Sequence, residues 1–147
     1  MRLQLWWAPG TPRLSPRQWR ARLRAPLIAC QLRASNPGQR IWAVFEPRSA
    51  SSCRRVFQDD FARAFAAADR VLIAPVFRST LPEDQRLSTS QLVADLRQSG
   101  VTAGEGTSID DLIATIVREH RAGDLVVLMS NGGFGGIHEK LLVRLSA

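Results

Sequence analysis

Residues that build disulfide scaffolds and metal centres are scarce in this sequence. Among 147 residues there are two cysteines, Cys30 and Cys53, and two histidines, His120 and His138. Their spacing matches neither a CxxC pair nor a zinc-ligand pattern. We therefore expect no disulfide framework and no metal site, and we place the chain in the cytoplasm, where thiols stay reduced.

Long apolar runs are also absent. No stretch reaches the roughly 18 apolar residues that a membrane-spanning helix needs. The apolar run Leu5–Ala8 is too short for a secretion signal, and Pro9 and Gly10 interrupt it. The sequence therefore indicates no membrane as a partner.

Acidic residues are missing from the first forty positions. Residues 1–40 hold eight arginines and no Asp, Glu or Lys, which gives them a formal charge of +8. Residues 41–147 hold eleven arginines, one lysine and thirteen acids, so their net charge is −1. Because the composition changes near Asn36-Pro37-Gly38, we divide the chain into a basic Arg/Pro/Trp-rich leader, residues 1–38, and a domain, residues 39–147.

Two interpretations of the basic leader stay open. Its arginines, together with Trp6, Trp7 and Trp19, would suit nucleic-acid binding through phosphates and stacked bases. An unstructured, solvated leader explains the same composition and is favoured, since the domain behind it is nearly neutral. Within the leader, residues 19–26 have the pattern of a short basic helix that Pro26 ends.

Behind the leader, strand patterns alternate with helix patterns. Buried strands are predicted by short apolar runs at 41–45, 71–77 and 125–129, with a weaker one at 101–103. Helices are predicted by apolar steps of three and four at 54–68, 88–100, from Ser108 onward, and 137–145. The expected N-caps of the first three are Ser51 or Ser52, Ser88 or Thr89, and Ser108. This alternation predicts an α/β domain with a mostly parallel sheet and helices on both faces. Since such sheets bind ligands beyond the carboxyl ends of their strands, it singles out the loops 46–52, 78–86 and 130–136.

The loop Ser130-Asn-Gly-Gly-Phe-Gly-Gly136 is the most unusual segment of the domain. Its glycines would let the backbone approach a phosphate or carboxylate, and the next helix would offer unpaired N–H groups. The loop completes neither GxxxxGK[ST] nor GxGxxG, so it is not a Walker A loop. A tight strand-to-helix connection stays equally open, although four glycines and an asparagine exceed what a plain connector needs.

The segment Glu46-Pro-Arg-Ser49 follows the first predicted strand of the domain. Arg48 offers the two-pronged guanidinium that suits a carboxylate, and Ser49 offers a hydroxyl donor. A surface arginine in a helix-entry loop is the plainer interpretation of the same residues.

Two segments together resemble one family. Residues 41–49, Ile-Trp-Ala-Val-Phe-Glu-Pro-Arg-Ser, with Phe57-Gln-Asp-Asp-Phe61, resemble the first strand and helix of the Mur ligase C-terminal domain. Residues 128–142, Leu-Met-Ser-Asn-Gly-Gly-Phe-Gly-Gly-Ile-His-Glu-Lys-Leu-Leu, resemble the end of that domain in the murein peptide ligase branch. The resemblance runs from about Asn36 to Leu145 and implies a Rossmann-like three-layer domain.

The resemblance also implies a reaction and a site. The family uses ATP and Mg²⁺ to join a recycled murein tripeptide to UDP-N-acetylmuramate, with the C-terminal domain holding the peptide. It implies that Arg48 and Ser49 lie near the carboxylates of the peptide. The pocket-lining residues it implies are Ser130, Asn131, Gly132 and Gly133, with His138 close behind.

Departures from the family limit these expectations. Residues 1–38 contain no counterpart of the family's Asp-Asp-Phe-Ala-His-His-Pro-type segment, which contacts ATP, and the P-loop and UDP-sugar domains are absent. We therefore expect no cofactor in this chain and no ligation by it alone, with an ATPase domain as a missing partner. Translation out of frame before about Gln31 is a hypothesis for the leader. It fails if no such segment appears in the other two reading frames.

One further alternative stays open at this point. The chain would also fit a non-catalytic binding module that recognises a carboxylate-rich peptide or a nucleotide.

Overall fold

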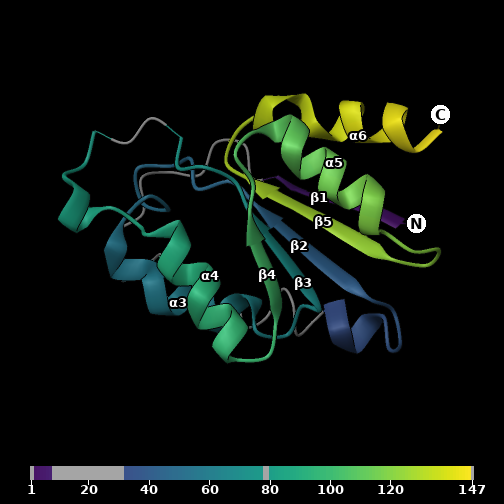
Figure 1. Ribbon diagram of the computed structural model, residues 1–147, viewed down its shortest axis with the longest axis horizontal. Helices are drawn as coiled ribbons and strands as arrows, with labels where there is room; N and C mark the ends of the chain where they lie inside the picture. Colours follow the sequence, from purple (N-terminus) through teal and green to yellow (C-terminus); the bar gives the residue numbers. More distant parts are fainter. Residues whose placement is uncertain (1, 8–31, 78–79, 147) are drawn as a thin grey trace.

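The computed structural model describes residues 2–7, 32–77 and 80–146 (Figure 1). Within these ranges five strands form one sheet, in the order β1-β5-β2-β3-β4. Their bounds are β1 Arg2–Trp7, β2 Ile41–Phe45, β3 Arg70–Ile73, β4 Thr102–Glu105 and β5 Leu125–Ser130. Every pairing is parallel, so the predicted parallel α/β sheet is confirmed.

Helices cover both faces of the sheet and make the domain three-layered (Figure 1). The α-helices are α3 Gln58–Phe65, α4 Thr89–Gln98, α5 Ile109–Glu119 and α6 Ile137–Ser146. Short 3-10 turns are η1 Arg55–Phe57, η2 Glu83–Gln85 and η3 Phe134–Gly136, and residues 32–35 are also helical. Among the described residues, no helix has the length and apolar character needed to cross a membrane.

The central strand β2 contributes to two hydrophobic cores. Ile41, Ala43 and Phe45 pack in the core formed with α3 and α4, whereas Trp42 and Val44 pack in the core formed with α5 and α6. All five side chains are buried. A strand covered on both faces needs an unbroken apolar run, which is why residues 41–45 show no polar alternation.

The helix starts agree with the sequence at two positions and differ at a third. Ser88 and Ser108 cap α4 and α5, each accepting a hydrogen bond from the backbone N–H three residues later. The prediction that Ser51 or Ser52 caps the helix after β2 is wrong. That helix begins with the η1 turn, and the Ser52 hydroxyl instead accepts hydrogen bonds within the preceding loop.

Two strands differ from their predicted bounds by more than one residue. β3 ends at Ile73 and not at Phe77, because Pro75 has no N–H to continue the ladder. The backbone N–H groups of Ala74 and Phe77 bond instead to the β2 strand and its loop, at Phe45 O and Pro47 O. β4 covers Thr102–Glu105, two residues further than expected.

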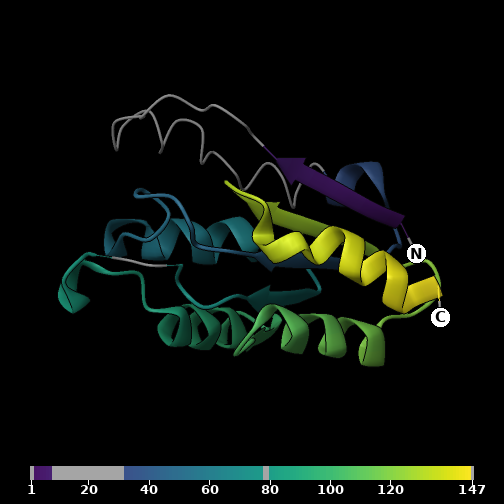
Figure 2. The same cartoon turned by 90° about the horizontal axis from the view of Figure 1, so that it is seen from above.

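The backbone of Arg2–Trp7 joins the sheet at its edge, beside β5 (Figure 2). For these six residues the favoured interpretation as an unstructured leader is wrong. A parallel ladder uses backbone groups alone, so composition carried no signal for it. The basic helix expected at 19–26, along with Trp19 and Cys30, lies outside the described residues.

The chain reverses its direction across the sheet between β2 and β5. From β2 it runs outward to β3 and β4 by way of α3 and α4 on one face. It then crosses to the other face in α5 and returns to the opposite side of β2 as β5. The carboxyl ends of β2 and β5 therefore flank a topological switch point, where sheets of this kind bind ligands.

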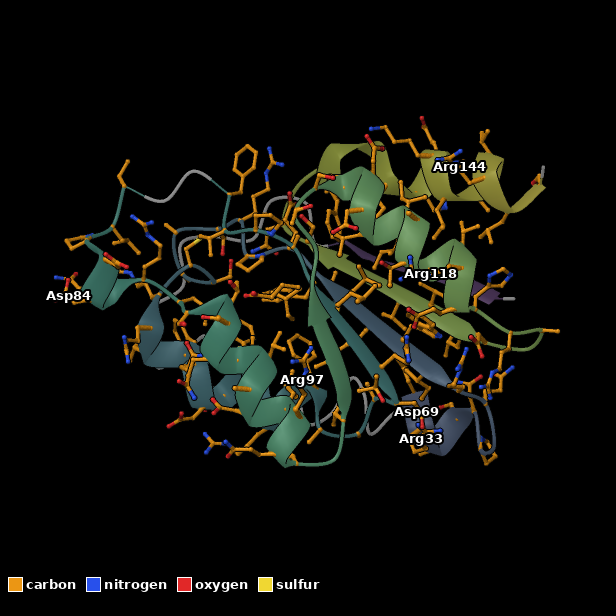
Figure 3. All side chains as sticks on the ribbon, viewed as in Figure 1. Arg33, Asp69, Asp84, Arg97, Arg118 and Arg144 are labelled. Carbon is orange, nitrogen blue, oxygen red and sulfur yellow. The ribbon has the colours of Figure 1, made fainter. Side chains whose placement is uncertain are left out.

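A buried carboxylate ties the amino ends of the strands together. Asp124 is 2% exposed and accepts hydrogen bonds from the Arg40 side chain, from the Trp42 indole at 2.8 Å and from the Arg121 backbone at 2.9 Å. Burial raises the pKa of Asp124, but these hydrogen bonds, the one from Arg40 foremost, lower it by more than burial raises it. The pKa of Asp124 therefore lies below its ordinary value. In Figure 3 the labelled pair Arg33 and Asp69 lies at this same end of the sheet.

We predict that Asp124→Asn lowers the free energy of unfolding by about 3 kcal/mol at pH 7, because Arg40 keeps its charge without a counter-ion. Since the pKa of Asp124 is lower in the folded chain, its contribution is fully present above the unfolded-state pKa of about 3.9 and declines as pH falls further. Urea unfolding at pH 7 and below pH 4 measures both effects. The gap between the two proteins should narrow at low pH, and exposed Asp84→Asn serves as the control.

Candidate functional site

A buried glutamate lies at the switch point. Glu46 follows β2 directly, is 5% exposed, and its backbone N–H bonds to Met129 O at 2.9 Å. The Ser130 hydroxyl donates a hydrogen bond to Glu46 Oε2, and Arg48 Nη1 lies 3.6 Å from Glu46 Oε1. The loops after β2 and β5, which the sequence singled out separately, therefore meet at one carboxylate.

Arg48 lies over both of these loops. Its Cζ atom is 3.9 Å from the centroid of the Phe77 ring, within range of a cation–π contact. Its side chain also passes directly over Gly132, where the Cβ atom of any larger residue would meet Nε at 2.5 Å. The side chain is 31% exposed, so part of it still faces solvent.

The Ser49 hydroxyl is used inside its own loop. It donates to Ser52 Oγ at 2.9 Å and accepts from the Ser52 backbone N–H at 3.0 Å. Ser52 Oγ in turn accepts from the backbone of Arg48 at 3.1 Å. Cys53 bonds to Pro47 O, and burial raises the pKa of its thiol. This loop is therefore held rigidly, and it fixes the direction in which Arg48 leaves the sheet.

The glycines of the 130–136 loop serve different purposes. Gly135 and Gly136 have φ angles of 56° and 70°, which favour glycine, and they turn the chain into α6. Gly132 has no such angle, and its missing side chain leaves room for Arg48. Phe134, at φ 44°, is buried against α5 and α6 and anchors the turn. The tight strand-to-helix connection therefore holds for Gly135 and Gly136, and the ligand-binding interpretation of the loop stays a prediction.

The remaining predicted site residues lie near this cluster or along the same loop. Asn131 is half-buried and Gly133 is exposed, with open space where a side chain would extend. His138 is the second residue of α6 and is partly buried. Among the described residues, neither Asn131 nor His138 has a side-chain hydrogen bond to the Arg48 cluster. The structure thus brings Arg48, Ser130 and Gly132 into contact and leaves the others beside them.

Two members of the cluster were missed from the sequence. The sequence could have indicated Glu46, because this charged residue directly follows the apolar run 41–45. It gives no such indication for Phe77, since an aromatic residue after a strand usually belongs to the core. Its 40% exposure and its contact with Arg48 depend on the course of the loop after Pro75.

Other features of the described residues do not add to this site. No group of three or more His, Cys, Asp and Glu side chains in these ranges is placed to hold a metal ion. A shallow hollow beside η1 and η2 shares no residue with the switch-point cluster, and its lining is Arg54, Arg55, Val56, Asp84 and Gln85.

Comparison with known proteins gives homologues of one kind. The chain is 38% identical over 109 residues to the UDP-N-acetylmuramate–L-alanyl-γ-D-glutamyl-meso-2,6-diaminoheptandioate ligase of Haemophilus influenzae, covering 74% of this chain and 22% of that protein. A solved domain from the corresponding ligase of Haemophilus ducreyi has a TM-score of 0.66 at 26% identity, covering 98% of this chain and 92% of that one. This chain belongs to the Mur ligase family. No family model matches it.

The chain is also similar to ligases of another Mur branch. The UDP-N-acetylmuramate–L-alanine ligase of Desulfitobacterium hafniense is 32% identical over 111 residues, covering 75% of this chain and 24% of that protein. The match is to the C-terminal domain region of these ligases, as the two sequence segments implied. The chain spans less than a quarter of the length of these two curated relatives.

We predict that Ser130→Ala lowers the free energy of unfolding of this Mur ligase domain by about 1–3 kcal/mol, because the buried Glu46 carboxylate loses a hydrogen-bond donor. Ser99→Ala is the matched control, since the Ser99 hydroxyl is exposed and bonds only to a helix carbonyl. Urea denaturation compares the two variants. Equal stability of the two would contradict the dependence of Glu46 on Ser130.

Proposed function

We propose that the chain provides the peptide-binding domain of an ATP-dependent ligase that joins UDP-N-acetylmuramate to the murein tripeptide in peptidoglycan recycling. The observation that carries the proposal is the partly exposed Arg48 at the switch point between β2 and β5. The names of the related ligases supply the ligand, L-alanyl-γ-D-glutamyl-meso-diaminopimelate, which is rich in carboxylates.

The charge of the site suits a carboxylate ligand. Arg48 offers a planar fork of N–H donors, and a carboxylate can accept two of them side by side. Glu46 offsets part of the arginine charge from 3.6 Å away. Ser130, Asn131 and the exposed Gly133 extend along the same edge, so an elongated peptide would contact them in turn, with Ser49 and His138 flanking it.

In this proposed function, the ATP-dependent steps belong to other parts of a complete ligase. The described residues hold no cluster that fits Mg²⁺, and the sequence has no Walker A pattern. We propose that the domain acts in the cytoplasm and needs an ATPase domain as its partner to ligate.

A non-catalytic module for carboxylate-rich peptides is the second candidate, because Arg48 would serve it equally well. A nucleotide is a poorer ligand for this site, since a phosphate group carries nearly two negative charges at pH 7 and Glu46 would repel it. Nucleic-acid binding would depend on the basic residues 1–38 alone, because residues 41–147 have a net charge of −1.

We predict that the chain binds the murein tripeptide and that Arg48→Ala weakens this binding by roughly 10- to 100-fold, the usual effect of losing hydrogen bonds to a charged group. Arg48→Lys should recover only part of the affinity, because an ammonium cannot reproduce the fork. Isothermal titration at constant salt measures both.

Arg144→Ala is the control, because Arg144 is exposed in the last turn of α6, at the end of the helix away from the 130–136 loop (Figure 3). An unchanged dissociation constant for Arg48→Ala refutes the role given to Arg48. Tripeptide binding by a chain that restores no ligation when mixed with a Mur ligase lacking its C-terminal domain favours the binding module over the ligase domain.

A further inference from the structure

The Arg48 side chain is held in place by Phe77 and Gly132. Neither the family resemblance nor the sequence analysis predicted this role for them. Phe77 comes from the loop after β3, and Gly132 comes from the loop after β5. Together with the β2 loop that carries Arg48, they bring the ends of three neighbouring strands to one guanidinium. The Phe77 backbone N–H also bonds to Pro47 O at 3.0 Å, which fastens the β3 loop to the β2 loop.

Gly132 is required by space and not by backbone conformation. Its φ lies outside the left-handed region, so alanine could adopt the same backbone. A Cβ atom there would lie 2.5 Å from Arg48 Nε, 2.7 Å from its Cδ and 3.0 Å from its Cζ. Because an arginine side chain is flexible, the protein would tolerate the methyl group by moving Arg48 out of its place.

Phe77 restricts the same guanidinium through its ring. The 3.9 Å separation between Arg48 Cζ and the ring centroid is that of close stacking, which is favourable for arginine. The ring is 40% exposed and belongs to neither hydrophobic core, and its face lies against Arg48.

Glu46 limits which edge of Arg48 a ligand can use. Its Oε1 atom lies by Nη1, and Ser130 holds its Oε2 atom. Of the described residues, Glu46 is the one that forms an ion pair with Arg48. The Arg48 side chain is thus held from three sides, by Glu46, Phe77 and Gly132, while 31% of it stays exposed.

We infer that Phe77 and Gly132 are positioning residues that hold Arg48 ready for a peptide carboxylate. This inference rests on the proposed function for its ligand. Fixing the guanidinium before binding reduces the conformational entropy that is lost when the carboxylate docks, which raises affinity without any new contact to the ligand. Neither residue needs to touch the peptide.

A double-mutant cycle without ligand tests the contact itself. Gly132→Ala in the full chain should lower the urea midpoint of unfolding, because Arg48 is displaced from Phe77 and Glu46. In an Arg48→Ala background the same change should leave the midpoint unchanged or raise it, since the three atoms nearest to the added methyl group all belong to the Arg48 side chain beyond its Cβ. Gly104→Ala is the control in both backgrounds, because a Cβ there makes an ordinary 3.6 Å contact with Leu72.

Titration with the murein tripeptide tests the positioning role. Phe77→Leu should weaken binding about fivefold, whereas Phe77→Tyr, which keeps the ring, should stay within about twofold of the unmodified chain. Gly132→Ala should weaken binding about tenfold. In an Arg48→Ala background neither Phe77→Leu nor Gly132→Ala should weaken binding further. If Phe77 had a merely structural role, the effect of Phe77→Leu on affinity would persist in the Arg48→Ala background. Its loss there, together with the retained affinity of Phe77→Tyr, identifies a role through Arg48.

The outcomes separate the two proposals. Equal effects of Gly132→Ala in both backgrounds, or an unchanged affinity of Phe77→Leu, overturns the positioning role even when the tripeptide binds well. Absence of tripeptide binding by the unmodified chain overturns the proposed function and the ligand named here. In that case the cycle in urea still decides whether Gly132 makes room for Arg48.

Discussion

Glu46 places a carboxylate where the central strand leaves the sheet, almost out of reach of water. A buried carboxylate is costly unless donors surround it, and one of its two donors comes from an element distant in sequence. Ser130, 84 positions later, supplies a hydroxyl, and Arg48 supplies the opposite charge. Meeting this need joins the loops after β2 and β5 and brings the arginine across Gly132 to Phe77. The geometry of the switch point follows from that one requirement.

The two ends of the sheet use an acid and an arginine in different ways. At the amino ends, Asp124 receives Arg40 Nη2 at 2.6 Å together with the indole of Trp42, and it is fully enclosed. At the carboxyl ends, Glu46 and Arg48 remain 3.6 Å apart, with the arginine partly in solvent. The hydrogen-bonding groups of Asp124 are thus used within the fold. In the pair of Glu46 and Arg48, part of the arginine side chain stays exposed, as expected at the edge where parallel sheets bind their substrates.

The sequence predicted the features that local patterns determine. Apolar runs located the strands, serines located two of the helix starts, and the carboxyl-end rule brought residues 46–52 and 130–136 to one edge. The family resemblance added Arg48 and Ser130 as neighbours of the peptide. That expectation stays a prediction about binding, although the structure places the two residues around Glu46.

Features that depend on the register of the strands or on the path of a loop could not be predicted from the sequence. The bond from Ser130 to Glu46 requires the β2–β5 alignment, in which Phe45 lies opposite Met129. The contact of Phe77 with Arg48 requires the early end of β3. The reason for glycine at position 132 is a side chain from another loop, and β1 joins through backbone bonds that leave no pattern. The central claim, that the murein tripeptide binds at this edge through Arg48, is tested most directly by following backbone amide resonances during a tripeptide titration. We expect shifts concentrated in residues 46–52, 77 and 130–134, whereas shifts centred on Arg40, Trp42 and Asp124 at the opposite end of the sheet, or none at all, would contradict this claim.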